Sequence, residues 1–416
     1  MGLDIGVFGA RGVPSTYSGY ETFLTTLLPE LVERGHKVTI YCRSGEGFEA
    51  TDWQGVHRKV LPAIAGKSTS TLSHSFVAAA AARRAGHDVV LTVNVANAFA
   101  TAFNRWTGQP VVMNVDGQEW LRGKWGTVAK SIFKTAARVT RYTTTAPVVD
   151  CEAMAAVYRS EFSMETTVLP YCPPSIDYEP SGMTVRNHDL EARRYFVTGG
   201  RLNPENNIDR IANAYAKTDF DYPLVILGAA NYDSPVAVNL RELAARDDRI
   251  RILGHIGDRS EFFDLLRGSA CYLHGHSVGG MNPSLVEAMW IESRILAFDT
   301  AFNRDTLGPK GQYFDFDGDS LTAALEQVLM DSEIDDELQR VEASLRIGDR
   351  FSVKAVCDGY QDVLVAAAAG SARRNLAIET PWAGAEPVED ADTSRKRSEW
   401  QSQAPVGAST QPPSRS

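Results

Sequence analysis

The sequence lacks the features of a secreted, disulfide-stabilised or membrane-spanning protein. Its five cysteines are far apart, with no pair at C-x-x-C spacing, which disfavours both a disulfide framework and a zinc knuckle. Met1 leads straight into apolar residues without the basic stretch of a secretory signal. No apolar run reaches the ~18 residues that cross a bilayer. These absences predict a soluble, cytoplasmic protein.

The sequence also has fewer basic than acidic residues. Lys and Arg number 42 against 52 Asp and Glu, which gives a formal net charge of −10. A surface this acidic is not expected to bind nucleic acid. The length of 416 residues predicts two or three domains.

Short β-branched runs alternate with longer amphipathic stretches, which is the pattern of βαβ units and a parallel sheet. The pattern restarts near residue 195, so the sequence predicts an α/β fold with two doubly wound domains, 1–178 and 179–350, divided in a Pro- and Ser-rich segment. Ligands bind at the carboxyl ends of parallel strands, so we expect the site in the cleft between these domains. The expected strands are 5–8, 38–41, 88–92, 110–114, 143–149, 195–198, 223–227, 250–253, 271–273 and 295–298.

Two segments follow the second predicted domain. Residues 351–368 have the spacing of a helix. Residues 371–416 are rich in Ser, Pro, Ala and Gln and are predicted to be disordered.

The first candidate ligand loop follows the first strand and leads into the first helix. Its residues of interest are Gly9, Arg11, Gly12 and Gly19. Glycines let backbone amides approach a ligand, and a helix N-terminus favours an anion. The loop has neither the dinucleotide fingerprint nor the Walker lysine. It predicts a phosphate or sugar contact, and the alternative is an ordinary strand–helix turn.

A second candidate follows the strand 110–114. Asp116 and Glu119 lie three residues apart there, which suits acid–base catalysis or recognition of hydroxyl groups. The same spacing is also a helix start signal, because an N-cap Asp pairs with a Glu three residues later. The residues alone leave both interpretations open.

A third candidate repeats the arrangement of strand, glycines, cation and helix. Gly199 and Gly200 precede Arg201, and Asn206 follows close by. An arginine in such a loop pairs well with a diphosphate. The alternative is a surface arginine beside a turn.

The fourth candidate is the densest in polar residues and glycine. Its residues of interest are His274, His276, Gly279, Gly280, Asn282, Ser284 and Glu287. A His-x-His pair can bind a metal, but no carboxylate lies near it before the Glu, so we expect no metal. The two glycines predict a loop that ends at a helix N-terminus and holds phosphate through its amides. The Glu, about one turn into that helix, is suitably placed for two ribose hydroxyls.

Residues 122–141 contain cations but no Asp or Glu. Four cations at helix spacing form one stripe, which predicts docking to an anionic membrane surface at about 1 kcal/mol per cation. The alternative is an ordinary solvated helix face. The stripe consists of Lys130, Lys134, Arg138 and Arg141.

These stretches resemble the retaining glycosyltransferases of family 4, which have the GT-B fold, and more narrowly the subgroup with a rhamnosyltransferase-type N-terminal domain. The resemblance covers about residues 3–366. The matching stretches are GARGVPSTYSGYETF (9–23), RGHKVTIYCR (34–43), NVDGQEWLRGKWG (114–126), GGRLNPENNI (199–208), HGHSVGGMNPSLVEAM (274–289) and FNRDTLGPKGQYF (302–314).

The resemblance implies two Rossmann-like domains that face a cleft, with the nucleotide-sugar donor held mainly by the second. The helix 351–368 would cross back to the first domain. Arg201 would hold the diphosphate, Glu287 the ribose, and the amides of the 279–284 loop the sugar and phosphates. Gly19 would close over the donor from the first domain.

Three positions depart from the common family pattern. The first Glu of the E-x7-E motif is replaced by Gly279, a phosphate-binding Lys by Asn206, and a frequent active-site His by Asp116. The missing contact to the donor sugar would then fall to His274 or His276. The narrower subgroup shares these replacements, so they do not imply inactivity.

The implied activity is transfer of a sugar with retention, best matched by L-rhamnose from dTDP-L-rhamnose. The expected acceptor is a lipid-linked saccharide or polysaccharide at the inner face of the plasma membrane, and neither metal nor cofactor is expected. Two alternatives remain: a non-catalytic relative that binds nucleotide-sugars, and a UDP-GlcNAc epimerase of the same fold.

Overall fold

The computed structural model describes residues 2–15, 19–48, 51–64, 69–123, 125–228 and 234–370. They belong to one compact unit, Met1–Thr380, and a second unit is Pro381–Ser416. The predicted disordered tail, 371–416, lies outside the described residues, as do residues 16–18 of the first candidate loop.

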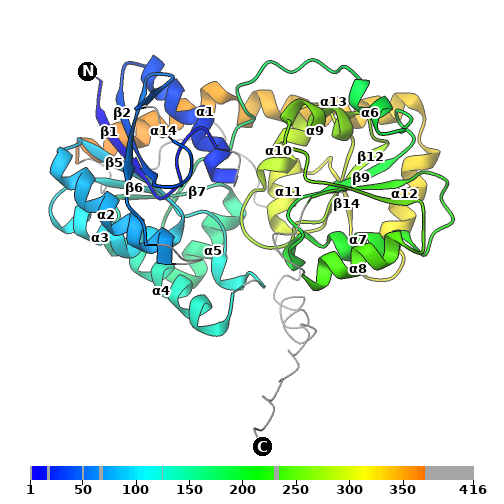
Figure 1. Cartoon of the computed structure of the whole chain (residues 1–416), viewed down its shortest axis with the longest axis horizontal. Coiled ribbons are helices and arrows are strands. Elements are labelled where there is room, and N and C mark those ends of the chain that lie inside the picture. The colour runs from blue at the N-terminus through cyan, green and yellow to red at the C-terminus, as the bar shows by residue number, and fades with distance from the viewer. Residues whose placement is uncertain are drawn as a thin grey trace, which may run out of the picture. The chain divides into compact units, whose positions relative to one another are not determined.

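The first half of the compact unit is built on an eight-stranded sheet with the order β3-β4-β2-β1-β5-β6-β7-β8 (Figure 1). Neighbouring strands pair in parallel, except β3 and β4, which are antiparallel. The strands are β1 (Asp4–Phe8), β2 (Lys37–Arg43), β3 (Asp52–Trp53), β4 (Val56–Leu61), β5 (Val89–Val93), β6 (Val111–Asn114), β7 (Ala146–Val149) and β8 (Thr167–Val168).

Helices cover this sheet, and β5 and β6 are buried along their whole length, as expected for strands with both faces covered. Helix α3 packs against both α2 and α4. The helices are α1 (Gly19–Glu33), α2 (Thr69–Ala85), α3 (Ala98–Trp106), α4 (Thr127–Thr143) and α5 (Glu152–Phe162), with the short 3₁₀ helices η1 (Val95–Asn97) and η2 (Glu119–Leu121).

The second half is built on a six-stranded parallel sheet with the order β11-β10-β9-β12-β13-β14. Its strands are β9 (Phe196–Gly199), β10 (Leu224–Leu227), β11 (Ile250–Gly254), β12 (Cys271–His274), β13 (Ile295–Phe298) and β14 (Gln312–Phe314). Its helices are α6 (Met183–Asn187), η3 (Pro204–Asn206), α7 (Ile208–Tyr215), α8 (Pro235–Ala244), α9 (Arg259–Arg267), α10 (Pro283–Trp290), α11 (Ala301–Leu307), α12 (Ser320–Met330), α13 (Glu333–Arg346) and the π-helical turn η4 (Ile347–Phe351).

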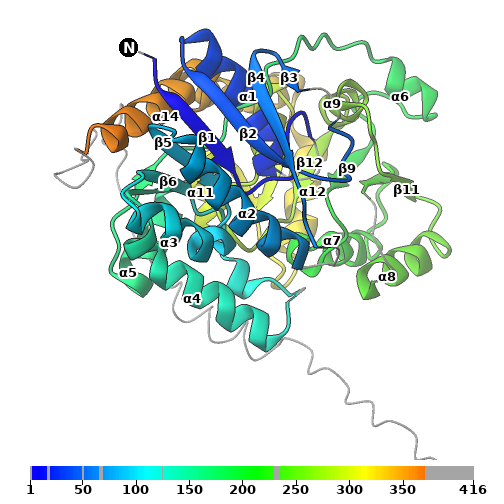
Figure 2. The ribbon, with the colours of Figure 1, turned by 60° about the vertical axis from the view of Figure 1, so that its left-hand side comes forward.

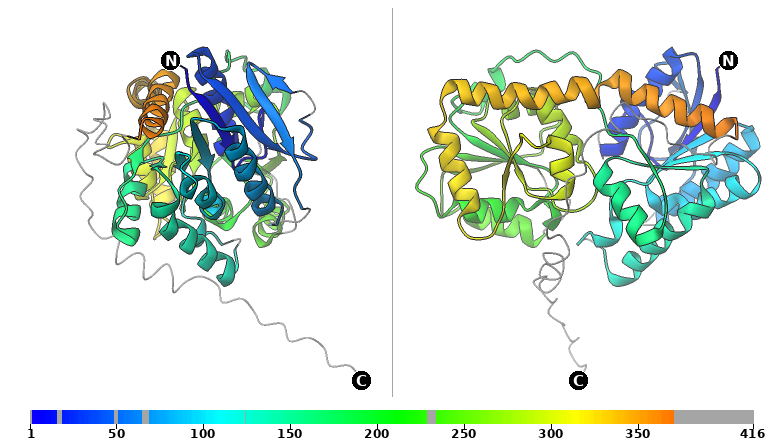
Figure 3. Two further views of the ribbon diagram at one scale, coloured as in Figure 1. Left: turned by 90° about the vertical axis from the view of Figure 1, so that its left-hand side faces the viewer. Right: turned by 180° about the vertical axis from the view of Figure 1, so that it is seen from behind.

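The last described helix, α14 (Val353–Ala368), follows the second half in sequence but packs against the first. It contacts α1, β5 and β6, and Figure 3 shows it running from the second half onto the first. Asn114 Nδ2 donates to the hydroxyl of its Tyr360 at 2.7 Å. The chain therefore passes between the halves twice.

The predicted α/β fold with two parallel, Rossmann-like sheets is confirmed. One predicted strand, 143–149, is wrong at its start, because α4 continues to Thr143 and β7 begins only at Ala146. The hydroxyl of Thr144 donates to the carbonyl of Thr140 at 2.9 Å. A threonine run that resembles a strand can thus end a helix, since the side chain bonds back to the preceding turn.

Candidate functional site

One loop of the second half, residues 279–283, lies directly against the first half. A β-carbon added to Gly117 would lie 2.7 Å from Cα of Gly279. A β-carbon added to Gly19, the first residue of α1, would lie 2.6 Å from Cγ of Pro283. The first neighbour is backbone and the second is a proline ring, and contacts this close leave no room for a β-carbon at either glycine.

A third contact of this loop involves Asp150, which directly follows β7. A β-carbon on Gly280 would lie 2.0 Å from Oδ1 of Asp150. Asp150 is completely buried, and this burial, together with the charge of Asp116, raises its pKa to about 7. The site therefore contains a carboxyl group that titrates near neutral pH.

Asp116 lies at the sharp turn after β6. Its backbone N–H donates to Oδ1 of Asn114 at 2.9 Å, and its φ of 58° is in the left-handed region. Its side chain does not cap the following helix, because η2 begins at Glu119 with Gln118 at the N-cap and no side-chain cap bond. The helix-start interpretation therefore does not describe Asp116.

Glu119 binds two neighbours on its own loop. Its Oε1 forms an ion pair with Nε of Arg122 at 2.6 Å, and its Oε2 accepts from Nε1 of Trp125 at 2.8 Å. Glu119 and Arg122 are both buried. The pair fixes the guanidinium so that Nη2 would lie 3.7 Å from a β-carbon on Gly279.

Arg122 was missed as a site residue, because the sequence places it in the basic segment with the helical stripe. Burial opposes its charge, but the carboxylates of Glu119, Asp116 and Glu205 raise its pKa above the ordinary value. Glu205 belongs to η3 in the second half and is itself buried. Arg122 is thus a cation of the first half that faces loops of the second.

The loop after β9 is held by Asn206. Its Nδ2 donates to the carbonyl of Arg201 at 2.6 Å, and its Oδ1 accepts from Nδ1 of His276 at 2.8 Å. Burial, and then the neighbouring His274 and the charges of Arg122 and Arg201, lower the pKa of His276 well below its usual value. A neutral His276 that donates through Nδ1 keeps Nε2 as an acceptor.

His274, at the end of β12, is also neutral. Burial lowers its pKa to about 3. Nδ1 lies 3.0 Å from the hydroxyl of Tyr272, while Nε2 is buried and has no hydrogen-bond partner among the described residues. Such an atom is a natural contact for a ligand group, since an unpaired buried polar atom is costly.

The N-terminus of α10 is capped internally. Oδ1 of Asn282 accepts from the backbone N–H of Ser284 at 3.0 Å and from its hydroxyl at 2.8 Å. This is the bonding of an N-cap residue. Neither side chain is therefore needed as a ligand to explain its presence.

Glu287, in the middle of α10, is buried and forms an ion pair with Arg259 of α9. Burial raises the pKa of Glu287, and the guanidinium of Arg259 acts in the opposite direction. Arg259 also lies over the ring of Phe263 at 4.9 Å. Nothing in the sequence singled out Arg259, since only the fold brings α9 beside α10.

Contacts within the first half account for Gly9, Arg11 and Gly12 of the first candidate loop. A β-carbon on Gly9 would lie 2.5 Å from the carbonyl oxygen of Val93, and one on Gly12 would lie 2.5 Å from the ring of Phe48. Nη1 of Arg11 binds both carboxylate oxygens of Glu46, at 3.1 and 3.0 Å. Packing accounts for these residues, and their contact with a ligand stays a prediction.

Comparison with known proteins gives one family-model match, which lies in the first half of the chain. Residues 17–177 match the family model described as Glycosyltransferase Family 4. We refer to the half of the compact unit that contains these residues as the family 4 domain. No curated protein matches the sequence.

Solved structures extend the likeness to most of the chain. Sucrose-phosphate synthase from Thermosynechococcus elongatus has a TM-score of 0.73 at 15% identity, covering 88% of this chain and 100% of its own. HepE from Anabaena, in complex with UDP-glucose, has a TM-score of 0.68 at 13% identity, covering 87% of this chain and 99% of its own. Trehalose-6-phosphate synthase OtsA has 0.68 at 11%, also covering 87% and 99%. The fold is thus the GT-B fold of glycosyltransferases.

The fold brings together most of the predicted residues but not all. Gly19 and Gly117, the neighbour of Asp116, lie against the 279–283 loop, and Glu119 holds Arg122 beside it. The α4 stripe instead lies on the outer side of that helix. The described residues contain no group of three or more His, Cys, Asp or Glu side chains able to hold a metal ion. No helix of the described chain is both long and apolar enough to cross a bilayer.

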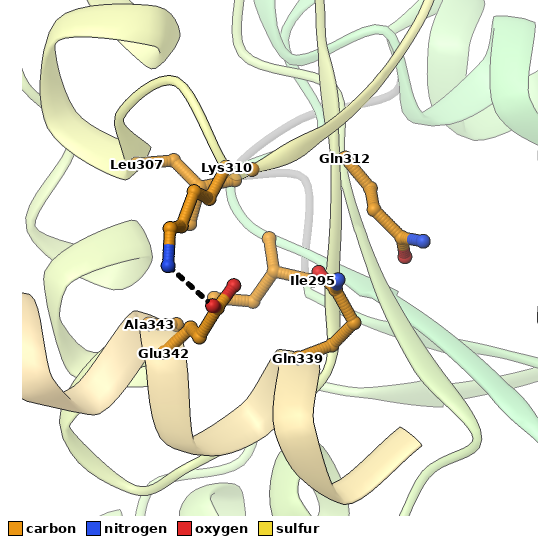
Figure 4. Close-up of a pocket in the computed structure, with 8 residues that line it drawn as sticks. Ile295, Leu307, Lys310, Gln312, Gln339, Glu342 and Ala343 are labelled. Carbon is orange, nitrogen blue, oxygen red and sulfur yellow. Dashed lines mark hydrogen bonds and ion pairs between the residues drawn. The ribbon is translucent and has the colours of Figure 1, made fainter. Parts of the chain in front are cut away.

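A separate small pocket in the second half does not belong to this site. It lies between Ile295, Gln312 and α13, and Lys310 and Glu342 form a 2.6 Å ion pair beside it (Figure 4). It encloses about 20 Å³, which is room for about one water molecule. A nucleotide-sugar cannot enter it.

Proposed function

We propose that the chain is a retaining hexosyltransferase that moves a sugar from a nucleoside diphosphate sugar to a saccharide acceptor. The observation that carries the proposal is the contact of the 279–283 loop with the family 4 domain, flanked by Arg122 and Arg201. A cation from each half beside one glycine loop suits a diphosphate, because a guanidinium binds phosphate oxygens through paired N–H groups.

Many family members have a phosphate-binding lysine at the position of Asn206. In this chain Arg122 supplies that positive charge instead. The amide of Asn206 already holds the Arg201 carbonyl and His276, so it serves the loop rather than a phosphate. Arg122 is fixed by Glu119 and needs little reorganisation to meet the charge that develops on the leaving diphosphate.

The other roles follow the polar groups of the site. Nε2 of neutral His274 accepts a hydrogen bond from a hydroxyl of the donor sugar. Glu287, oriented by Arg259, binds the ribose. Asp116, with Glu119 beside it, faces the acceptor.

In the reaction, the bond between C1 of the sugar and the diphosphate oxygen breaks. The acceptor hydroxyl oxygen forms a bond to the same face of C1, and its proton passes to the departing diphosphate oxygen. The charge of the leaving group is met by Arg201, Arg122 and loop amides, without a metal. Closure of the two halves excludes water and so limits hydrolysis of the donor.

The proposed donor is dTDP-L-rhamnose, and the proposed acceptor is a lipid-linked saccharide or polysaccharide. The support for rhamnose is the resemblance of GARGVPSTYSGYETF and NVDGQEWLRGKWG to the rhamnosyltransferase subgroup. A UDP-sugar is the second candidate donor, because HepE, which shares the fold, was solved with UDP-glucose.

The test begins with thermal unfolding in the presence of dTDP, UDP, GDP or ADP. A ligand at 100 times its Kd adds about 2.7 kcal/mol, and each kcal/mol raises the Tm by about 2–4 °C for domains near this size. A shift with dTDP supports the rhamnose donor, and a shift with UDP alone supports the second candidate. If no nucleotide raises the Tm, the proposed donor site is wrong.

Incubation of the matching nucleotide-sugar with and without a saccharide acceptor then separates the activities. Sugar transferred with an unchanged anomeric configuration supports the proposal. A new epimer in the absence of acceptor indicates an epimerase. Tight nucleotide binding without any transfer to the acceptors offered favours a binding protein.

A further inference from the structure

Three neighbouring helices of the family 4 domain carry no acidic residue. Neither Asp nor Glu occurs in α2, α3 or α4. Helix α3 contacts both of the others, and the three helices lie next to one another in Figures 1 and 2. We refer to the outer side of these helices as the acid-free face. It is a local exception in a chain with a net charge of −10.

The acid-free face carries cations on all three helices. Arg83 and Arg84 are exposed at the end of α2, and Arg105 lies in α3. In the α4 stripe, Lys134, Arg138 and Arg141 are exposed and Lys130 is partly buried. One member, Lys134, pairs with Glu161 of α5 at 3.3 Å, which marks the edge of the face. The positive charge is therefore wider than the single helix that the sequence indicated.

Aromatic side chains are exposed on the same face. Every exposed Phe, Trp or Tyr among the residues that the structure describes lies on α2, α3 or α4. Helix α3 is mostly buried between its neighbours, yet Trp106 is 75% exposed. On α4, Val128 and Ile132 are also exposed beside the cations. The exposed aromatic residues are Phe76, Phe103, Trp106 and Tyr142.

Positive charge combined with exposed aromatic rings limits which kinds of partner can bind the acid-free face. A polyanion such as nucleic acid would be met by the cations, but it gives no reason for exposed Val128 and Ile132. A protein interface places apolar residues in its centre and a polar rim around it. Cations interspersed with amphipathic rings match a bilayer surface, where cations meet lipid phosphates and Trp and Tyr lie at the level of the headgroups.

We propose that the acid-free face docks on an anionic lipid bilayer. Arg83, Arg84, Lys134 and Arg138 contact headgroup phosphates, and Trp106 enters the interfacial layer. Docking needs no membrane-spanning helix. The proposal goes beyond sugar transfer and does not depend on it, because vesicle binding is measured without donor or acceptor.

The experiment is co-sedimentation of the full chain with vesicles of phosphatidylcholine, with and without phosphatidylglycerol. The charge variant R83Q/R84Q/K134Q/R138Q should bind the anionic vesicles at least about 100-fold more weakly. The aromatic variant F103S/W106S should bind roughly 10-fold more weakly at the same salt concentration. The control variant K217Q/R246Q removes two exposed cations of the second half and should bind like the unaltered protein.

Three results would overturn the proposal. One is equal binding to vesicles with and without phosphatidylglycerol, and another is unchanged binding of the charge variant. The third is a loss with the charge variant but none with F103S/W106S, which would indicate a general polyanion site. All variants change exposed side chains, and an unchanged Tm shows that each is folded.

Discussion

Asp150 and Gly280 join the two halves of the compact unit through a contact that admits no side chain. The carboxylate of Asp150, at the end of β7, lies where the β-carbon of any other residue at position 280 would have to be, with Oδ1 only 2.0 Å away. Real β-carbons essentially never approach an atom this closely. The loop that carries the candidate donor site is therefore seated on a buried carboxyl group of the family 4 domain.

Replacing Gly280 by alanine should disturb this contact with Asp150. The added methyl group and the Asp150 carboxylate cannot both keep their positions, and overpacking of this kind costs about 1–3 kcal/mol. Thermal unfolding should show a lower Tm for G280A. The matched control is G257A, since a β-carbon on Gly257 meets no atom within 4 Å. Equal Tm values for the two variants would contradict the contact.

The titration of Asp150 predicts a pH dependence of stability. Its pKa rises from the model-compound value of 3.8 to about 7 on folding, so the stability associated with its neutral form is fully present below pH 3.8 and is lost as the pH rises through 7. In D150N, which cannot ionise, Tm should fall less between about pH 5 and pH 8 than in the unaltered protein. The exposed Asp248 provides the control D248N. A pH profile of D150N parallel to that of the unaltered protein would argue against a buried, neutral Asp150.

Arg122 is expected to recognise the diphosphate of the donor. R122Q should bind a nucleoside diphosphate about 10- to 100-fold more weakly, which corresponds to about 1.5–3 kcal/mol for a hydrogen bond to a charged group. It should bind the matching monophosphate with a much smaller loss. R122K, which keeps the charge but not the planar fork, should fall between. Equal losses for the mono- and diphosphate would instead mean that Arg122 only holds Glu119 in place. Isothermal titration calorimetry measures both, with R246Q in the second half as the control.

The pair of Glu287 and Arg259 predicts a double-mutant cycle. R259Q leaves the buried Glu287 carboxylate without its cation, and removal of one partner of a buried ion pair costs about 3–5 kcal/mol; because Arg259 is 31% exposed, we expect about 2–3 kcal/mol. E287Q in the same chain removes the buried charge, so the double variant should recover part of this loss. Urea unfolding of the four proteins measures the coupling. Additive losses would show that the two side chains do not interact.

The fold was largely predictable from the sequence, because its signals are local. Runs of apolar and β-branched residues such as Val89–Val93 identify buried parallel strands. Gly35, with φ of 85°, follows the end of the first helix in the left-handed conformation that is typical of a glycine there. The largest error in a strand start, at Thr143, arose because β-branched residues favour strands on average while the hydroxyl group of threonine can also bond to a preceding helical turn.

The candidate site was predictable only where its residues lie in glycine-rich loops after strands. Asp150 also follows a predicted strand, so its place at the carboxyl edge was within reach, but its contact with Gly280 depends on how the two sheets meet. For the same reason, the sequence could not identify Arg122 and Arg259 as residues of the site. Their partners Gly279 and Glu287 lie far along the chain, and no periodicity of residues encodes such a pairing.

The return of α14 to the first half has a consequence for synthesis on the ribosome. Tyr360, which bonds to Asn114 of β6, is made long after the first sheet has been completed at β8. About 200 residues separate β8 from the end of α14, so at about 5–20 residues per second the family 4 domain waits roughly 10–40 s for its last helix. During that interval the surface of α1, β5 and β6 that α14 covers is uncapped, and the nascent chain must either shield it or expose it to chaperones.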